Sequence, residues 1–125
     1  MIRGRKSPVV HVLAYRKRQG DDIQLTVTPD PLDMTQFPKG PHIITWRLDT
    51  KGFRFPFPEE GPAIEFTSPG AKETFLDMKV SECGRRVTVL DKNRDGLAFA
   101  YNVHVLEEET KLRAFLDPVI GNNTP

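Results

Sequence analysis

The sequence predicts an all-β protein, folded as an antiparallel β-sandwich of about seven or eight strands. Two observations carry this prediction. Apolar and polar residues alternate with a period of two in several short segments, which is typical of strands with one face in a core and the other in water. Eleven prolines and nine glycines interrupt the 125-residue chain at intervals too short for long helices. A β-barrel is the alternative architecture.

The alternating segments give the strands in chain order. We expect strands over residues 8–15, 23–28, 43–49, 75–81, 87–89, 97–105 and 112–116. The longest places Leu97, Phe99, Tyr101, Val103 and Val105 on one face. An Asp-Gly pair between alternating apolar segments favours a tight turn, so we expect a hairpin over Arg86–Leu106 with residues 93–96 at its tip. Residues 67–73 are the best place for a turn of helix.

The length and composition fit one soluble domain over residues 1–125, with flexible ends at 1–7 and 122–125. Cys83 is the single cysteine, so no disulfide can form within the chain, which fits a reducing compartment. The apolar run 9–15 is too short for a membrane span and continues into basic residues rather than a cleavage site. We therefore expect a cytoplasmic protein with no membrane partner.

Three short motifs carry a resemblance to known domains. They are Thr45-Trp46-Arg47-Leu48, the segment Ala100–Val105, and the close Leu116–Asn122. Together they resemble small uncharacterised bacterial β-sandwich domains that have a Trp strand, a Tyr-x-Val-x-Val strand and an Asp-Pro-x-Ile-x-Asn terminus. The resemblance covers residues 42–122. It implies an immunoglobulin-like or cupredoxin-like sandwich and supplies no activity.

A cupredoxin-like sandwich raises the question of copper. A blue-copper centre needs two histidines, a cysteine and usually a weak axial methionine. Here Cys83 is followed by Gly84 and two arginines, the next histidine is His104, and no methionine follows the cysteine. We therefore expect no copper site. His11, His42 and His104 could form a metal or acid–base cluster only if the fold brings them together, and we expect them to be separate polar residues.

A weak calcium site is one hypothesis for the segment 91–96. Asp91, Asn93 and Asp95 alternate before Gly96, as in the opening of a calcium-binding loop. The twelfth position of that register is Asn102 instead of glutamate, and strands flank the segment where helices would be expected. A plain turn is the alternative, and we expect no cofactor.

The segment Phe53–Pro58 is a candidate partner surface. Phe53, Phe55 and Phe57 alternate with Arg54 and prolines, which stiffen the backbone and remove donors. Such an arm could present aromatic rings to a partner at low entropic cost. The alternative is an edge strand whose phenylalanines close the core.

Charge is unevenly distributed along the chain. The first 20 residues contain six basic side chains and no acidic one, whereas the rest contain twelve basic and seventeen acidic, for a net charge of +1. The six are Arg3, Arg5, Lys6, Arg16, Lys17 and Arg18. This segment could contact nucleic acid. Since Tyr15 is the one aromatic residue among them, neutralisation of the acidic body is the favoured alternative and nucleic acid is an unlikely partner.

No catalytic pattern stands out. The chain has no Gly-x-Ser-x-Gly elbow and no phosphate-binding glycine loop, and the acidic runs 59–60 and 107–109 are typical of solvated loops. We therefore predict a non-enzymatic binding or assembly module that contacts another protein, or a second copy of itself, through strand edges or loops.

Overall fold

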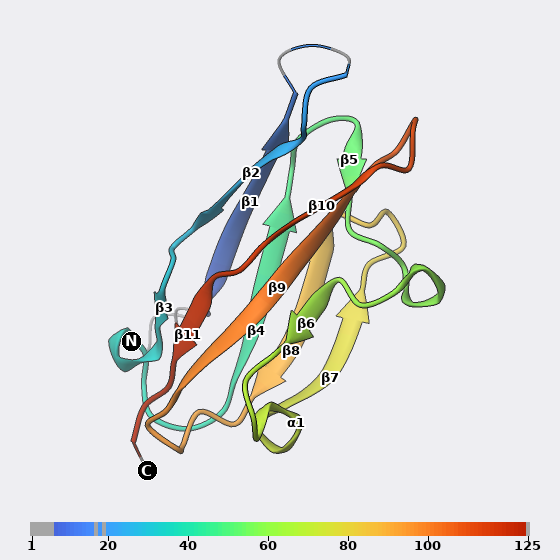
Figure 1. The fold of residues 1–125 in the computed structure, drawn as a ribbon. Helices are drawn as coiled ribbons and strands as arrows, with labels where there is room; N and C mark the ends of the chain where they lie inside the picture. Colours follow the sequence, from blue (N-terminus) through green and yellow to red (C-terminus); the bar gives the residue numbers. More distant parts are fainter. Residues whose placement is uncertain (1–6, 17, 19, 125) are drawn as a thin grey trace, which may run out of the picture.

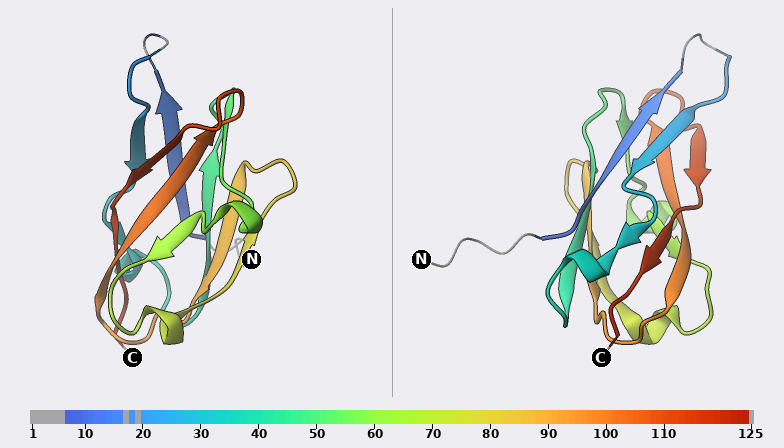
Figure 2. Two further views of the ribbon diagram at one scale, coloured as in Figure 1. Left: turned by 45° about the vertical axis from the view of Figure 1, so that its right-hand side comes forward. Right: turned by 90° about the vertical axis from the view of Figure 1, so that its left-hand side faces the viewer.

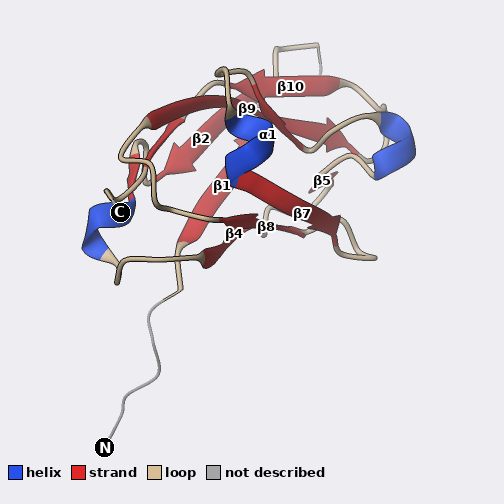
Figure 3. Ribbon diagram, turned by 90° about the horizontal axis from the view of Figure 1, so that it is seen from below, coloured by secondary structure: helices blue, strands red, loops and turns tan. Residues whose placement is uncertain are grey.

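The computed structural model describes residues 7–16, 18 and 20–124, which form two β-sheets packed face to face (Figure 1). The strands are β1 (Val9–Tyr15), β2 (Gln24–Thr28), β3 (Leu32–Asp33), β4 (His42–Leu48), β5 (Phe53–Arg54), β6 (Ile64–Phe66), β7 (Phe75–Val80), β8 (Arg86–Asp91), β9 (Ala98–Glu107), β10 (Arg113–Leu116) and β11 (Val119–Gly121). Short helical turns lie around the two layers, as Figure 3 shows: η1 (Met34–Gln36), η2 (Pro58–Glu60) and α1 (Ala71–Thr74). The predicted all-β sandwich is confirmed.

The first sheet has the strand order β2-β1-β4-β8-β7. Strands β1, β4 and β8 bury every second residue, and β-branched and aromatic side chains fill most of the inward positions, where they pack well on a pleated surface. The fully buried members include Val10, Val12, Ile44, Trp46, Leu48 and Val87. The outward positions are mostly polar, so the alternation in the sequence corresponds to the two faces of this sheet.

The second sheet is built around β9, the longest strand. One edge of β9 pairs with β11 and then β10, and the other edge pairs with β6 and β5. Strand β3 extends the sheet beyond β11. Phe99, Tyr101, Val103 and Val105 face the first sheet, as their spacing predicts. The same prediction is wrong for Leu97, which precedes the strand and is 58% exposed.

A buried aromatic pair joins the centres of the two sheets. Trp46 on β4 donates its indole N–H to the Tyr101 hydroxyl on β9 at 3.1 Å, and the rings meet edge to face at 5.5 Å. Both side chains have no exposed surface. Burial raises the pKa of the Tyr101 phenol, so the hydroxyl stays neutral. Beside this pair, Phe75 stacks on Phe66 at 4.1 Å.

The predicted hairpin over Arg86–Leu106 is wrong. Strand β8 pairs with β4 and β7 in the first sheet, whereas β9 belongs to the second, so residues 92–97 cross between the layers. The Asp-Gly pair bends this crossing. Gly96 has φ +68°, and its N–H donates to the Asn123 carbonyl at 2.7 Å instead of closing a two-strand ladder.

Several smaller features also differ from expectation. The sheets are mixed, because β1 runs parallel to β4 and β3 parallel to β11. Asn122 and Asn123 are buried, so a flexible end from residue 122 is wrong, while residues 1–6 lie outside the described part of the chain. The expected helical turn forms at Ala71–Thr74. Among the described residues, no helix has the length and apolar character needed to cross a bilayer.

The Trp46–Tyr101 bond gives a direct test of the fold. Tyr101→Phe keeps the ring but leaves the buried indole N–H without an acceptor, so we expect the free energy of unfolding to fall by about 1–3 kcal/mol. Urea unfolding followed by the fluorescence of Trp46, the single tryptophan, measures it. Tyr15→Phe is the matched control, because Tyr15 is 46% exposed. Equal midpoints for the two variants would show that the bond does not stabilise the sandwich.

Candidate functional site

The Phe53–Pro58 segment belongs to the core. Phe53 is 7% exposed and Phe55 is fully buried, so a partner surface made by these two rings is wrong and the core-closing alternative is correct. Phe57 is half-buried beneath the Arg54 guanidinium, which lies 4.5 Å from the ring centre. The alternating aromatic pattern therefore reflects packing.

An ion pair holds this segment in place. The two terminal nitrogens of Arg54 donate to the two carboxylate oxygens of Glu60 at 2.7 and 2.8 Å. Glu60 also accepts the backbone N–H of Phe57 at 2.9 Å. The bonds from Arg54 and Phe57 lower the pKa of Glu60 to about 2. These contacts fix the conformation of the segment, so it is an ordered loop and not a free arm.

The oxygens of the 91–96 segment are used within the protein. Asp91 Oδ1 accepts the Asn93 N–H at 2.9 Å, and Asn93 Oδ1 accepts the Asn123 N–H at 2.7 Å. Asp95 accepts hydrogen bonds from the Thr74 hydroxyl at 3.0 Å and the Leu97 N–H at 3.1 Å. A calcium ion needs six to eight oxygen ligands. The three predicted ligands do come close together, but they form a hydrogen-bonded network that closes one end of the sandwich.

Two oxygens in this network have no donor. Asp91 Oδ2 and Asn122 Oδ1 are both buried and unpartnered. Asp91 has no exposed surface, and burial raises the pKa of its carboxyl to about 6. The charge of Asp95 adds to this effect, and the hydrogen bond from the Asn93 N–H opposes it. A buried carboxylate therefore strains the network at neutral pH.

The structure keeps the histidines apart. His11 lies exposed on β1, and His42 begins β4, where its Nε2 contacts the Pro38 carbonyl oxygen at 2.6 Å. His104 lies in the other sheet, on β9, where its Nε2 bonds the Glu65 carboxylate at 3.0 Å. Cys83 is exposed in the turn before β8, where the Ser81 hydroxyl lowers the pKa of its thiol. The described residues contain no group of three or more His, Cys, Asp or Glu that could hold a metal.

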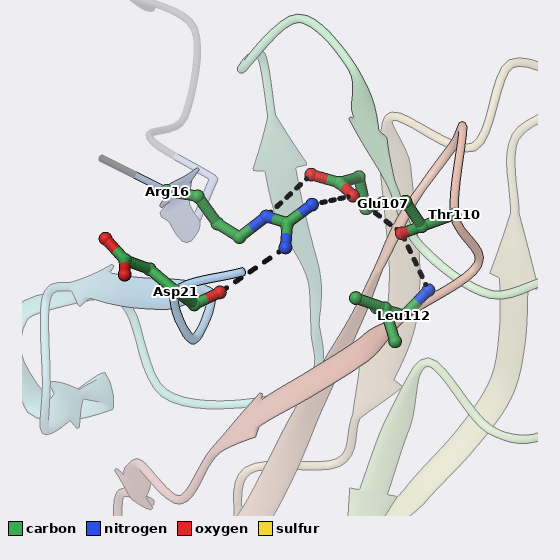
Figure 4. Close-up of polar contacts among 5 residues, drawn as sticks. All are labelled: Arg16, Asp21, Glu107, Thr110 and Leu112. Atoms are coloured by element: carbon green, nitrogen blue, oxygen red, sulfur yellow. Dashed lines mark hydrogen bonds and ion pairs between the residues drawn. The ribbon is translucent and has the colours of Figure 1, made fainter. Parts of the chain in front are cut away.

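The described part of the basic N-terminal segment has a structural role at Arg16. Its Nε and one terminal nitrogen donate to both oxygens of Glu107 at 3.1 and 2.5 Å, and Thr110 donates to the same carboxylate (Figure 4). The Arg16 side chain is only 11% exposed. Arg16 thus neutralises an acidic residue of its own fold and ties β1 to β9. The predictions for Arg3, Arg5, Lys6 and Lys17 lie outside the described residues.

The strand edges are poorly suited to pairing with another strand. Strand β7 carries a bulge between Leu76 and Lys79, with Asp77 at φ +56° and two charged residues in its middle. Strand β6 is three residues long and is flanked by Pro62 and Pro69. On the opposite side of the sandwich, β2 lies beside β10. Bulges, charges, prolines and shortness are the usual devices that block edge pairing.

Strands β6 and β7 border one open side of the sandwich (Figure 2). A groove runs between them. It consists of two hollows of about 520 and 340 Å³ that share Pro62 and Met78. Its apolar lining also includes Pro58, Ala63, Ile64, Phe66, Phe75 and Val80. Met78 is 40% exposed. Sequence reasoning missed this groove, because its walls come from two segments that no local pattern links.

Comparisons with protein-family models and with curated proteins found no match to the chain.

The burial of the Asp91 carboxyl predicts how the stability of the protein depends on pH. The folded-state pKa of this carboxyl, about 6, lies above the ordinary aspartate value of 3.8, so the folded state holds a proton that the unfolded state releases, and the protein loses stability as the pH rises from about 4 to 6. Asp91→Asn removes the charge and gives position 91 an NH2 donor beside Asn122. We expect the variant to be more stable than the wild type by about 1–2 kcal/mol at pH 7, with the gain shrinking toward pH 4.

Denaturant unfolding at pH 4.5, 6 and 7.5 measures this difference. Asp95→Asn is the contrasting variant, because both oxygens of Asp95 already accept hydrogen bonds, and it should destabilise the protein across this range. A constant difference between wild type and Asp91→Asn at all three pH values would contradict the assignment.

Proposed function

We propose that this domain is a non-enzymatic protein-binding module whose groove between β6 and β7 holds an extended segment of another protein. The observation that supports this proposal best is the position of Met78. It is the shared wall of both hollows, and it leaves a flexible apolar side chain exposed between two sheet edges. Methionine is frequent at surfaces that adapt to varied partners, because its unbranched side chain repacks easily.

The shape of the open side favours an extended ligand. The two hollows are small and share Pro62 and Met78, so one extended chain can contact both, whereas a helix of about 10–12 Å diameter is wide for either. The bulge in β7 argues against continuous backbone pairing, so apolar side chains of the ligand would supply the binding energy. The charged residues in the lining are Glu65, Lys72 and Glu73, of both signs, so net charge would contribute little to selection.

Methionine methyl groups provide the test. The described part of the chain contains Met78 in the groove and Met34 in the core with no exposed surface, so 13C-methyl labelling gives a reporter and an internal reference. The probes are synthetic decapeptides in which leucine or valine alternates with threonine. We expect the Met78 signal to shift on titration while the Met34 signal stays in place.

Two substitutions then test whether the peptide binds in the groove. Met78→Gln should weaken binding of the peptide about tenfold, the equivalent of about 1.4 kcal/mol of lost apolar contact. Leu97→Gln removes an equally apolar side chain that is 58% exposed and lies outside the groove, and it should have no effect. Binding that Met78→Gln leaves unchanged, or no shift of the Met78 methyl with any of these peptides, would refute the proposal.

A further inference from the structure

A row of three basic side chains crosses the outer face of the first sheet. His11 on β1 lies opposite Arg47 on β4, and Arg47 lies opposite Arg86 on β8. All three occupy outward positions of their strands, since their neighbours along each strand are buried. The spacing between paired strands is about 4.8 Å, so the three side chains are direct neighbours across the sheet. We call them the basic row.

Acidic side chains compensate the basic row only in part. Arg47 reaches only Asp49, at 3.5 Å, in a pair whose two side chains are 38% and 59% exposed, and its Nε has no acceptor. The side chains of His11 and Arg86 make no hydrogen bond or ion pair with the described chain. The outward positions of β1, β2, β4 and β8 include no aspartate or glutamate, whereas β7, the fifth strand of this sheet, has Asp77 beside Ile43 and Thr88. Arg47 and Arg86 are like charges placed opposite each other on neighbouring strands, an arrangement that destabilises a sheet.

Exposed apolar side chains flank the basic row on the same face. Leu13 and Tyr15 follow His11 at alternate positions of β1 and are 55% and 46% exposed. Ile43, on the outward side of β4, is 57% exposed. Arginine and tyrosine are enriched in protein interfaces, whereas isolated exposed leucines are common and carry no meaning alone. What distinguishes this face is the combination of these side chains with Arg86, which has no acidic partner among the described residues, and Arg47, whose one ion pair is long and exposed.

We propose that this face docks an acidic segment of another protein. Its carboxylates would pair with Arg47 and Arg86, whose planar guanidinium groups bind carboxylates through two parallel hydrogen bonds. Its apolar side chains would cover Leu13 and Ile43. Residues 21–125 contain seventeen acidic and twelve basic side chains, so within this part of the chain the basic row is a favourable approach for an acidic ligand.

The same face suits nucleic acid less well. Single strands bind through stacking of bases on aromatic side chains, and Tyr15 is the single aromatic residue among the outward positions of the described strands of this sheet. Leu13 and Ile43 offer no hydrogen bonds to bases or phosphates. The inference does not rest on the groove between β6 and β7, which involves other residues.

The test uses the full chain and a fluorescent synthetic decapeptide in which glutamate alternates with leucine. We expect binding that weakens as salt increases, because the charges are exposed. Arg86→Gln should weaken it at least fivefold. Arg94→Gln is the matched control, because it removes the same charge elsewhere. Arg94 is exposed, lies in the crossing between β8 and β9, and has no side-chain hydrogen bond or ion pair within the described chain. Met78→Gln should have no effect, which separates this proposal from the groove.

Three results would overturn the inference. The first is an affinity for the peptide that is undetectable, or equal for the wild type, Arg86→Gln and Arg94→Gln. The second is tighter binding of oligothymidine than of the acidic peptide, lost in Arg86→Gln, which would assign the face to nucleic acid. The third is self-association in sedimentation that Arg86→Gln abolishes, which would assign the face to a second copy of this chain.

Discussion

The hydrogen bond between Trp46 and Tyr101 is the contact on which the arrangement of the two sheets depends. An indole has a single N–H, and here its acceptor is one hydroxyl on the opposite sheet, so the bond is satisfied in one relative position of β4 and β9. These are the central strands of their layers. Strands β1 and β8 take their positions from β4, and β6, β10 and β11 take theirs from β9. The open side lies between β6 and β7, because each pairs with only one of the described strands, β6 with β9 and β7 with β8.

Hydrogen bonds and an ion pair between polar side chains stabilise the two ends of the sandwich around this core. At one end Asp91, Asn93 and Asn123 join the β8–β9 crossing to the C-terminal segment. At the other, Arg16 joins the first sheet to Glu107 on the second. Side chains that resemble ligands in the sequence thus satisfy buried backbone groups, which would otherwise destabilise the fold. Asp91 is the exception, since one of its oxygens is buried without a donor.

The sequence reveals which segments form the longer strands, but it does not reveal which distant strands pair. Two-residue alternation in the sequence was sufficient to predict β1, β2, β4 and β9, because each is five or more residues long and has one buried face. It missed β3, β6 and β11, which have two or three residues and take their extended form from neighbouring strands. It also mispaired β8 with β9, since the Asp-Gly signal is the same in a hairpin and in a crossing between layers. Burial of Phe53 and Phe55 depends on β9, which lies some fifty residues away.

The two proposed surfaces share this long-range origin. Pro62 meets Met78 only because β6 and β7 border the same open side, and Arg47 meets Arg86 only because β4 pairs with β8. Both surfaces rest on strands that the core holds in place, so little conformational entropy would be lost when a partner binds. A small apolar groove and a short basic row could then bind usefully without a large interface. A rigid sheet with edges closed to pairing restricts recognition to side chains, and side-chain recognition is what would give such a domain a choice of partner.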